Sequence, residues 1–313
     1  MSDVSRFPVR GVLPVFQTPF HDDETVDFEV LQREIEWLFE CGVDGVVMAM
    51  VSEVLRLTTD ERELVAARVC QFAEGHGAVV ISVGAESTYV AERLARHAEA
   101  HGATAVMAIP PIAVASGEDE LLRYYERIVR TISIPVVVQD ASGYVGRPMS
   151  IELQAGLLKT FGDRVLFKPE ASPIGPRLTQ LRDATQGLAR VFEGSGGAAL
   201  QDSYQRGVIG TMPGAEVIRA IVALWQALEN GDEARAYRLS LPIVALVAIQ
   251  CNLDGYLAVE KHLLVKQGIF KSTKTRGPVG FFLDTETRRA VDRLYDMLMQ
   301  EVDRPAVDFK SKI

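Results

Sequence analysis

The sequence predicts an α/β protein, a (β/α)8 TIM barrel with a C-terminal helical extension. Short apolar segments alternate with amphipathic helical segments every 25 to 30 residues or so, which is the βαβ rhythm of a parallel sheet. Eight such units fit into about 225 residues, the number and size expected for a closed barrel. The alternative, a doubly wound open sheet, is disfavoured because no glycine fingerprint follows the first strand.

The predicted strands are short and almost wholly apolar, as expected for strands covered on both faces. Segment 44–50, Asp-Gly-Val-Val-Met-Ala-Met, and segment 102–108, Gly-Ala-Thr-Ala-Val-Met-Ala, resemble each other in order and composition. This similarity supports a repeated strand-and-helix unit. The predicted strands are residues 9–17, 44–50, 78–83, 102–108, 134–138, 164–167, 190–193 and 207–211.

Capping residues mark the first predicted helices. Asp27 precedes a segment with apolar residues on one face, and Gly42 follows it at the left-handed position that ends many helices. Thr58 and Glu61 have the spacing of a capping box. The predicted barrel helices are residues 28–41, 59–73, 87–100, 117–132, 149–160, 175–185, 197–205 and 215–229.

Three further helical segments follow the last barrel unit, at residues 231–250, 255–267 and 284–302. We interpret them as an addition that packs on the barrel rather than as a separate domain. The predicted organisation is a barrel at 1–230, an extension at 231–303 and a tail at 304–313.

Composition excludes several classes of function. The 313 residues include 33 basic and 42 acidic side chains, giving a net charge of −9, which disfavours sequence-independent nucleic-acid binding. The longest apolar stretch, 241–249, is far shorter than the roughly 20 residues of a membrane span. Residues 1–6 lack the apolar core of a signal peptide, and three scattered cysteines do not form a disulfide pattern. We therefore predict a cytoplasmic protein with reduced Cys41, Cys70 and Cys251.

No pattern points to a metal or an organic cofactor. His97 and His101 are four residues apart on a predicted helix, but we interpret them as a polar surface pair. The glycine cluster at 194–197 could cradle a phosphate, yet it matches no known phosphate-loop spacing and is better explained as a tight turn.

Barrel enzymes carry their reacting groups at the C-terminal ends of the strands, and Lys168 stands at such an end. No lysine precedes Lys159 in the sequence, and Lys168 is the only lysine that ends a predicted barrel strand. A lysine shielded from water loses its charge more easily, and an uncharged amine can attack a carbonyl carbon. The alternative is a lysine that extends into solvent.

Two glutamates stand close to Lys168 in the predicted barrel. Glu170 follows it by two residues, so that in an extended chain both side chains point to the same side. Glu170 is therefore a candidate acid or base, or simply an ion-pair partner of Lys168. Glu193, at the end of the seventh strand, is a second acid/base candidate or a salt-bridge residue at the rim. Other polar residues at strand ends are Ser52, Glu53, Gln139, Asp140 and Thr211.

These motifs resemble the dihydrodipicolinate synthase / N-acetylneuraminate lyase family of Schiff-base class I aldolases over essentially the whole chain. Segment 11–20 contains the family's opening Gly-Val-Leu-Pro and Thr-Pro-Phe, and Lys168 falls at the Schiff-base lysine. Gly194 matches a glycine after the seventh strand. Segments 49–53, 109–111 and 260–268 stand at the family's Gly-Thr-Thr-Gly-Glu, Pro-Tyr-Tyr and C-terminal helical motifs.

The departures from the family pattern are also informative. The family's proton-relaying Tyr-Asn-x-Pro motif is replaced by Gln-Asp-Ala-Ser at 139–142. Met50 and Val51 replace the two threonines that usually hold the substrate carboxylate, which leaves Ser52 and backbone N–H groups for that task. Glu170 is a carboxylate that the better-known synthases and lyases lack. In these respects the chain resembles L-2-keto-3-deoxyarabonate dehydratase, a branch in which glutamates replace the tyrosine.

The resemblance implies a lyase that dehydrates a 2-keto-3-deoxy sugar acid, converting L-2-keto-3-deoxyarabonate to α-ketoglutarate semialdehyde and water. Lys168 would form the imine, with Glu170 as the favoured base and Glu193 as the favoured acid, although these two roles can be exchanged. No cofactor is implied, and the partners would be a small 2-oxo acid and further copies of the chain in a dimer or tetramer. The expected substrate-binding residues are Val51, Ser52, Gln139, Gly194 and Thr211.

Two alternatives stay open at this point. A pyruvate-dependent class I aldolase or a condensing enzyme would use the same imine and break or form a different bond. A non-catalytic barrel retained for ligand sensing or for assembly would not form an imine at all.

Overall fold

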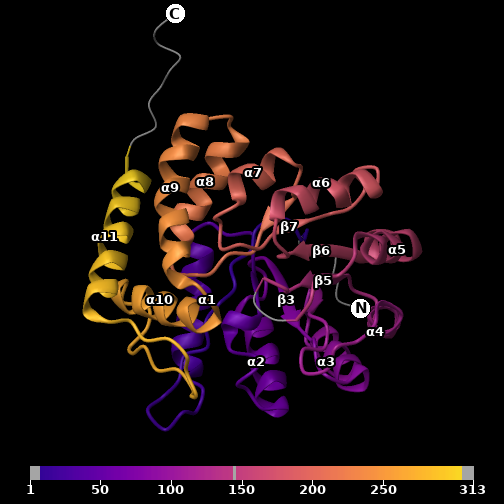
Figure 1. Ribbon diagram of the computed structural model, residues 1–313. Coiled ribbons are helices and arrows are strands. Elements are labelled where there is room, and N and C mark those ends of the chain that lie inside the picture. Colours follow the sequence, from indigo (N-terminus) through magenta and orange to yellow (C-terminus); the bar gives the residue numbers. More distant parts are fainter. Residues whose placement is uncertain (1–7, 144–145, 305–313) are drawn as a thin grey trace, which may run out of the picture.

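The computed structural model describes residues 8–143 and 146–304. The polar start 1–6 and the predicted tail 304–313, apart from Arg304, lie outside this range. Within it, strands form a central ring and helices surround that ring, with the C-terminal helices on one side (Figure 1). The predicted (β/α)8 barrel with additional C-terminal helices is confirmed.

All paired strands of the ring are parallel. They form two hydrogen-bonded groups, β2-β3-β4-β5-β6 and β1-β8-β7. Isolated bridges from Val15 to Val47 and from Phe167 to Val191 join the two groups, so the ring closes and a doubly wound sheet is excluded. The strands are β1 Gly11–Val12, β2 Gly45–Val47, β3 Ala78–Ser82, β4 Ala105–Ala108, β5 Val136–Asp140, β6 Val165–Pro169, β7 Phe192–Glu193 and β8 Gly210–Thr211.

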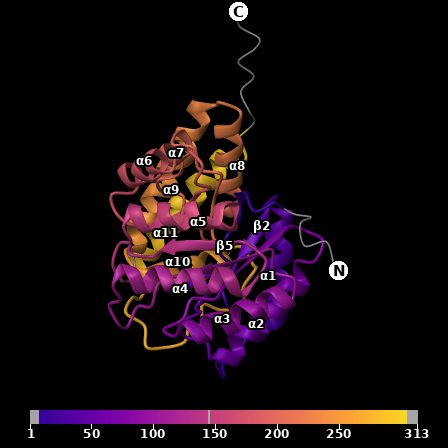
Figure 2. The ribbon, with the colours of Figure 1, turned by 90° about the vertical axis from the view of Figure 1, so that its right-hand side faces the viewer.

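The barrel helices begin where the capping residues predict. Asp27 accepts a hydrogen bond from the Val30 amide at 3.0 Å, and Thr58 and Glu61 form a capping box. In the side view, α4 and α5 lie along strand β5 (Figure 2). The helices are α1 Phe28–Glu40, α2 Thr59–Phe72, α3 Thr88–Ala100, α4 Glu118–Thr131, α5 Ile151–Phe161, α6 Ile174–Ala184, α7 Leu200–Gln205 and α8 Ile218–Glu229.

Several strand limits differ from the prediction. β5 and β6 each continue two residues further, because Gln139 pairs with Lys168 in the strand register despite being polar. The segment predicted as a strand at 44–50 ends at Val47, and a 3-10 turn, η1, follows at Met50–Ser52. The first strand is reduced to two residues, and Pro14 has no N–H with which to extend its pairing.

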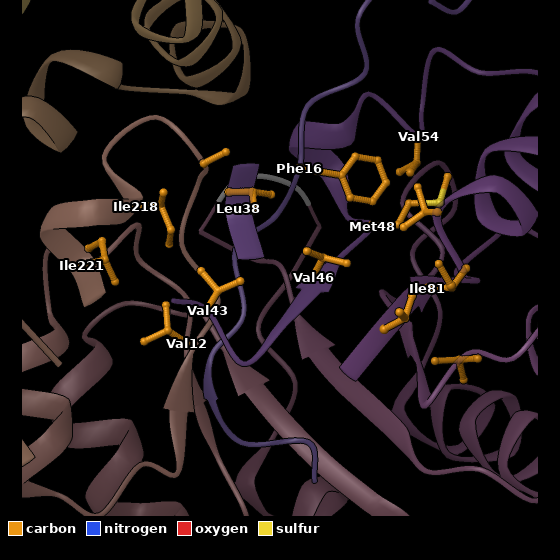
Figure 3. Packing of buried hydrophobic residues seen from close by; sticks show 14 of the residues in the cluster. Val12, Phe16, Leu38, Val43, Val46, Met48, Val54, Ile81, Ile218 and Ile221 are labelled. Carbon is orange, nitrogen blue, oxygen red and sulfur yellow. The ribbon is translucent and has the colours of Figure 1, made fainter. Parts of the chain in front are cut away.

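Alternate residues of the strands face the inside and the outside of the ring. Val137, Leu166 and Phe192 belong to the apolar cluster that fills the barrel. Their neighbours along the chain belong to a larger cluster between the strands and the helices. Figure 3 shows part of this outer layer, in which Val12 of β1 lies near Ile221 of α8.

The C-terminal extension consists of α9 (Glu233–Gln250), α10 (Leu253–Lys266) and α11 (Thr285–Val302). Helix α9 packs on α8, and α10 packs on η1 at the barrel mouth. The buried Lys261 of α10 donates to the carbonyl oxygens of Thr18 and Lys274 at 2.9 and 2.7 Å and to the Glu53 carboxylate. Among the described residues, no helix has the length and apolar character needed to cross a membrane.

Candidate active site

A pocket opens at the C-terminal ends of the strands, between the barrel and α10. The space between its walls, including its open mouth, is about 390 Å³. The strand side of the wall includes Val51, Gln139, Lys168, Glu170 and Gly194. The wall also includes Leu253, Tyr256 and Glu260, which are three and four residues apart and therefore share one face of α10.

Lys168, Glu170 and Gln139 form one hydrogen-bonded group in this pocket. Lys168 Nζ lies 2.9 Å from Glu170 Oε1, and Gln139 Nε2 donates to Glu170 Oε2 at 2.7 Å. The side chains of Lys168 and Glu170 are each only 4% exposed. Val137 and Leu166 point into the barrel, and side chains two or four residues further along an extended chain point the same way. Gln139 follows Val137 by two residues, and Lys168 and Glu170 follow Leu166 by two and four, so all three point inward.

Burial raises the pKa of the Glu170 carboxyl above its usual value, while the charge and hydrogen bond of Lys168 and the amide of Gln139 oppose that shift. A carboxyl group with a raised pKa holds a proton more readily than an exposed one. Glu170 is therefore suited to accept and return protons at the Lys168 nitrogen and at an adjacent carbon.

Gly194 allows this close arrangement. A β-carbon at Gly194 would lie 2.8 Å from both Lys168 Cε and Glu170 Cγ, which is closer than real β-carbons approach other atoms. The two following glycines, Gly196 and Gly197, have φ values of +67° and +88°, as a tight turn requires.

Glu193 and Thr211 do not line the pocket. Each follows an inward-facing position, Phe192 in β7 and Gly210 in β8, and so points to the helix side of the ring. Thr211 Oγ1 donates to Glu193 Oε2 at 2.6 Å, and the Ser195 amide donates to Oε1, also at 2.6 Å. The Glu193 carboxylate thus stabilises the turn after β7, and the structure does not bring it together with Lys168 in the pocket.

Ser52 is buried and also lies outside the pocket wall. Its hydroxyl donates to the Phe16 carbonyl oxygen at 2.6 Å and accepts from the Ala49 amide at 3.1 Å. The hydroxyl therefore holds η1 in place. Val51 does line the pocket, and the first amides of a helical turn are not used by the turn itself.

Two other carboxylates at strand ends have structural partners. Glu53 pairs with Lys261 across the barrel mouth. Asp140 accepts from the amides of Ser142 and Met149 at 3.2 and 3.1 Å and so shapes the loop after β5.

Glu260 was not among the residues selected from the sequence, yet it is fully buried and lines the same pocket as Lys168. Its Oε2 accepts a hydrogen bond from Gln17, whereas Oε1 has no partner among the described residues. A second buried carboxylate, Glu216, lies beside it. The available signal was a glutamate at a helical position between the buried Val259 and Leu263.

In the described ranges, no group of three or more His, Cys, Asp and Glu side chains is placed to hold a metal ion. The rings of His97 and His101 stack with centroids 4.0 Å apart on α3. The three cysteines are free.

Comparison with known proteins identifies the family to which this chain is similar. The profile of the dihydrodipicolinate synthetase family matches residues 8–297. An L-2-keto-3-deoxyarabonate dehydratase of Azospirillum brasilense is 27% identical over 278 residues, which is 86% of this chain and 88% of that protein. A 4-hydroxy-tetrahydrodipicolinate synthase of Methanococcus vannielii is 35% identical over 186 residues, 59% of each chain.

Solved structures show the same architecture. The crystal structure of a dihydrodipicolinate synthase from Rhodopseudomonas palustris superimposes with a TM-score of 0.84 at 26% identity, covering 93% of this chain and 98% of that one. A sialic acid aldolase from Ruminococcus gnavus shares the fold with a TM-score of 0.83 at 22% identity, covering 93% and 97%. The chain therefore belongs to the dihydrodipicolinate synthetase family and is a lyase of the class I aldolase type.

Proposed function

We propose that this lyase dehydrates a 2-keto-3-deoxy sugar acid through an imine at Lys168. The observation that carries the proposal is the Glu170 carboxylate, which binds Lys168 and Gln139 at 2.9 and 2.7 Å inside the pocket. The likeness to the Azospirillum brasilense dehydratase over most of both chains supports L-2-keto-3-deoxyarabonate as the first substrate to test.

The first steps form the imine. Glu170 accepts a proton from the Lys168 ammonium group, and the resulting amine attacks the C2 carbonyl carbon of the substrate. Glu170 then returns the proton to the hydroxyl group of the tetrahedral adduct, which leaves as water. A protonated imine remains on Lys168, and Glu170 is again a carboxylate.

The imine withdraws electrons and acidifies the protons on C3. Glu170, the carboxylate beside the imine nitrogen, removes one of them. The C4–O bond breaks, C3 and C4 become doubly bonded, and hydrolysis of the imine releases an unsaturated 2-oxo acid. For a five-carbon substrate this acid is an isomer of α-ketoglutarate semialdehyde, so that tautomerisation completes the conversion.

In this proposal the substrate carboxylate binds at η1, whose Val51 lines the same pocket as Lys168. Because Met50 and Val51 carry no polar side-chain group and the Ser52 hydroxyl is engaged, the backbone amides of this turn are the donors in the proposal. Gln139, which lines the same pocket, is the proposed partner of a substrate hydroxyl.

The test is borohydride reduction of the protein with a panel of 2-keto-3-deoxy acids, followed by mass spectrometry. The expected result is a stable adduct on Lys168 together with water loss from the substrate. Release of pyruvate in place of water loss would instead identify an aldolase. Absence of any adduct with any 2-oxo acid would support a non-catalytic barrel.

A dimer or tetramer in solution and a cytoplasmic location stay predictions, and sedimentation measurements would test the first of them.

A further inference from the structure

Dehydration needs a proton donor for the departing hydroxyl group, and the hydrogen-bonded group of Lys168, Glu170 and Gln139 does not supply one. Breaking the C4–O bond produces hydroxide unless the oxygen is protonated as it leaves. Glu170 is the base for C3, and the amide of Gln139 is not a proton donor of useful acidity. Glu193, expected from the sequence to be the acid, is turned away from the pocket.

We propose that Glu260 is the general acid of the reaction, with Glu216 beside it as the second member of a carboxyl pair. This inference rests on the proposed dehydratase function. In the step assigned to Glu260, its carboxyl proton passes to the C4 hydroxyl while the C4–O bond breaks, and one water molecule leaves. Glu170 has meanwhile gained the C3 proton, and exchange with solvent returns both groups to their starting states.

Position is the first support. Glu260 of α10 lines the same pocket as Lys168 and Glu170. In the proposal, a substrate whose C2 is bonded to Lys168 extends its distal carbons through this pocket toward Glu260. Glu260 is completely buried, and its Oε1 atom has no hydrogen-bond partner in the part of the chain that the structure describes.

The second support is the pairing of Glu260 with Glu216 at Gly214, a glycine of the pocket wall. A β-carbon on Gly214 would collide with both Glu216 Oε2 and Glu260 Oε1, so these two oxygens face the same small space. Glu216 Oε2 also lacks a hydrogen-bond partner within the described residues, whereas Glu216 Oε1 accepts a hydrogen bond from Gln250 Nε2 at 3.0 Å. Two buried carboxylates this close together cannot both be ionised at low cost, so one of them retains a proton.

The surrounding charges favour the protonated form. Burial raises the pKa of Glu260 well above its usual value, and the negative charges of Glu216 and Glu34 raise it further. The hydrogen bond from the Gln17 amide and the charge of Lys261 act in the opposite direction. Lys261 directs its amine to Glu53 and to two carbonyl oxygens instead. Lys168 directs its amine to Glu170.

Tyr256, one turn before Glu260 on α10, is the competing donor because it lines the same pocket. A carboxylic acid transfers a proton to a leaving hydroxyl group more readily than a phenol does, which favours Glu260. The variant Tyr256→Phe is therefore the matched comparison for Glu260→Gln.

The experiment compares the full-length parent with Glu260→Gln, which is nearly isosteric and keeps an oxygen for the Gln17 amide. Borohydride trapping of pyruvate on Lys168 should be retained, since this adduct needs no leaving group. The turnover number for dehydration should fall by about 10²- to 10⁴-fold. The decline of the parent's turnover at high pH, where Glu260 loses its proton, should disappear. In Glu216→Gln this decline should instead move to lower pH, because one neighbouring negative charge is removed.

A second substrate separates acid catalysis from a structural effect. A 2-keto-3-deoxy acid with an acetate ester at C4 has a leaving group that needs no proton. With this substrate, Glu260→Gln should approach the parent rate. The assignment would be overturned if Glu260→Gln lost equal activity with both substrates, or if its turnover in the first experiment stayed within about threefold of the parent. It would also be overturned if only Tyr256→Phe lost activity. If the parent dehydrates its substrate and only the Glu260 result fails, the proposed function stands; if the parent forms no adduct, both fall.

Discussion

Gly194 lies directly against Lys168, at a distance that leaves no room for a β-carbon. The same absent β-carbon would meet Glu170 at 2.8 Å, so one glycine directly after β7 leaves the space that both reacting groups occupy. The close approach comes from a neighbouring strand, which explains why the stretch around Lys168 alone does not reveal it.

We expect Gly194→Ala to displace Lys168 and Glu170 and to lower turnover by up to about 10²-fold, because a displacement of about 1 Å in an active site can have that effect. Crowding should also lower the free energy of unfolding by about 1–3 kcal/mol. Gly156→Ala is the control, since Gly156 lies within α5 with open space around it and should become more stable by about 0.5–1 kcal/mol. Steady-state kinetics and urea titration measure both effects. Full activity in Gly194→Ala would contradict the contact.

Glu170→Gln should slow the removal of a C3 proton by about 10²- to 10⁴-fold while leaving a ligand-binding pocket in place. The measurement is exchange of the methyl protons of pyruvate for deuterium, followed by NMR, because this exchange needs the imine and the base but no leaving group. Glu229→Gln, an exposed change at the end of α8, is the control. Exchange at the parent rate in Glu170→Gln would remove Glu170 from the role of base.

Lys261→Met should destabilise the protein by about 3–5 kcal/mol, because it leaves the carboxylate of Glu53 buried without its main partner. The same change at Lys271, whose side chain is 58% exposed, should cost less than about 0.5 kcal/mol. Denaturant unfolding measures both. The double variant Glu53→Gln/Lys261→Met should recover part of the loss, and failure to recover any of it would show that the ion pair is not the cause.

Burial raises the pKa of Glu34 from 4.5 to about 8. Because the unfolded chain releases this proton at lower pH than the folded protein, the free energy of unfolding should fall as pH rises from 4.5 to 8. The slope from one such group is at most about 1.4 kcal/mol per pH unit. Unfolding measured across this range should be less dependent on pH in Glu34→Gln, whereas Glu36→Gln, an exposed change on the same helix, should follow the parent. Parallel curves for all three proteins would contradict the raised pKa.

The barrel and the position of Lys168 were predictable from the sequence because both depend on local patterns. Apolar strands and capped helices repeat along the chain, and a lysine directly after the apolar segment 164–167 stands at the reactive end of a strand. The two-residue spacing of Lys168 and Glu170 also predicts that they share a side, and the structure places them 2.9 Å apart.

Only the tertiary structure decided which polar residues enter the pocket. Both faces of a parallel barrel strand are buried, so an apolar strand does not show from its sequence which face points inward. Glu193 and Thr211 occupy the outward positions, and Gly194 occupies the inward one. Glu260 and Lys261 lie more than 90 residues from Lys168 along the chain, and packing alone brings the first to the pocket and the second to Glu53.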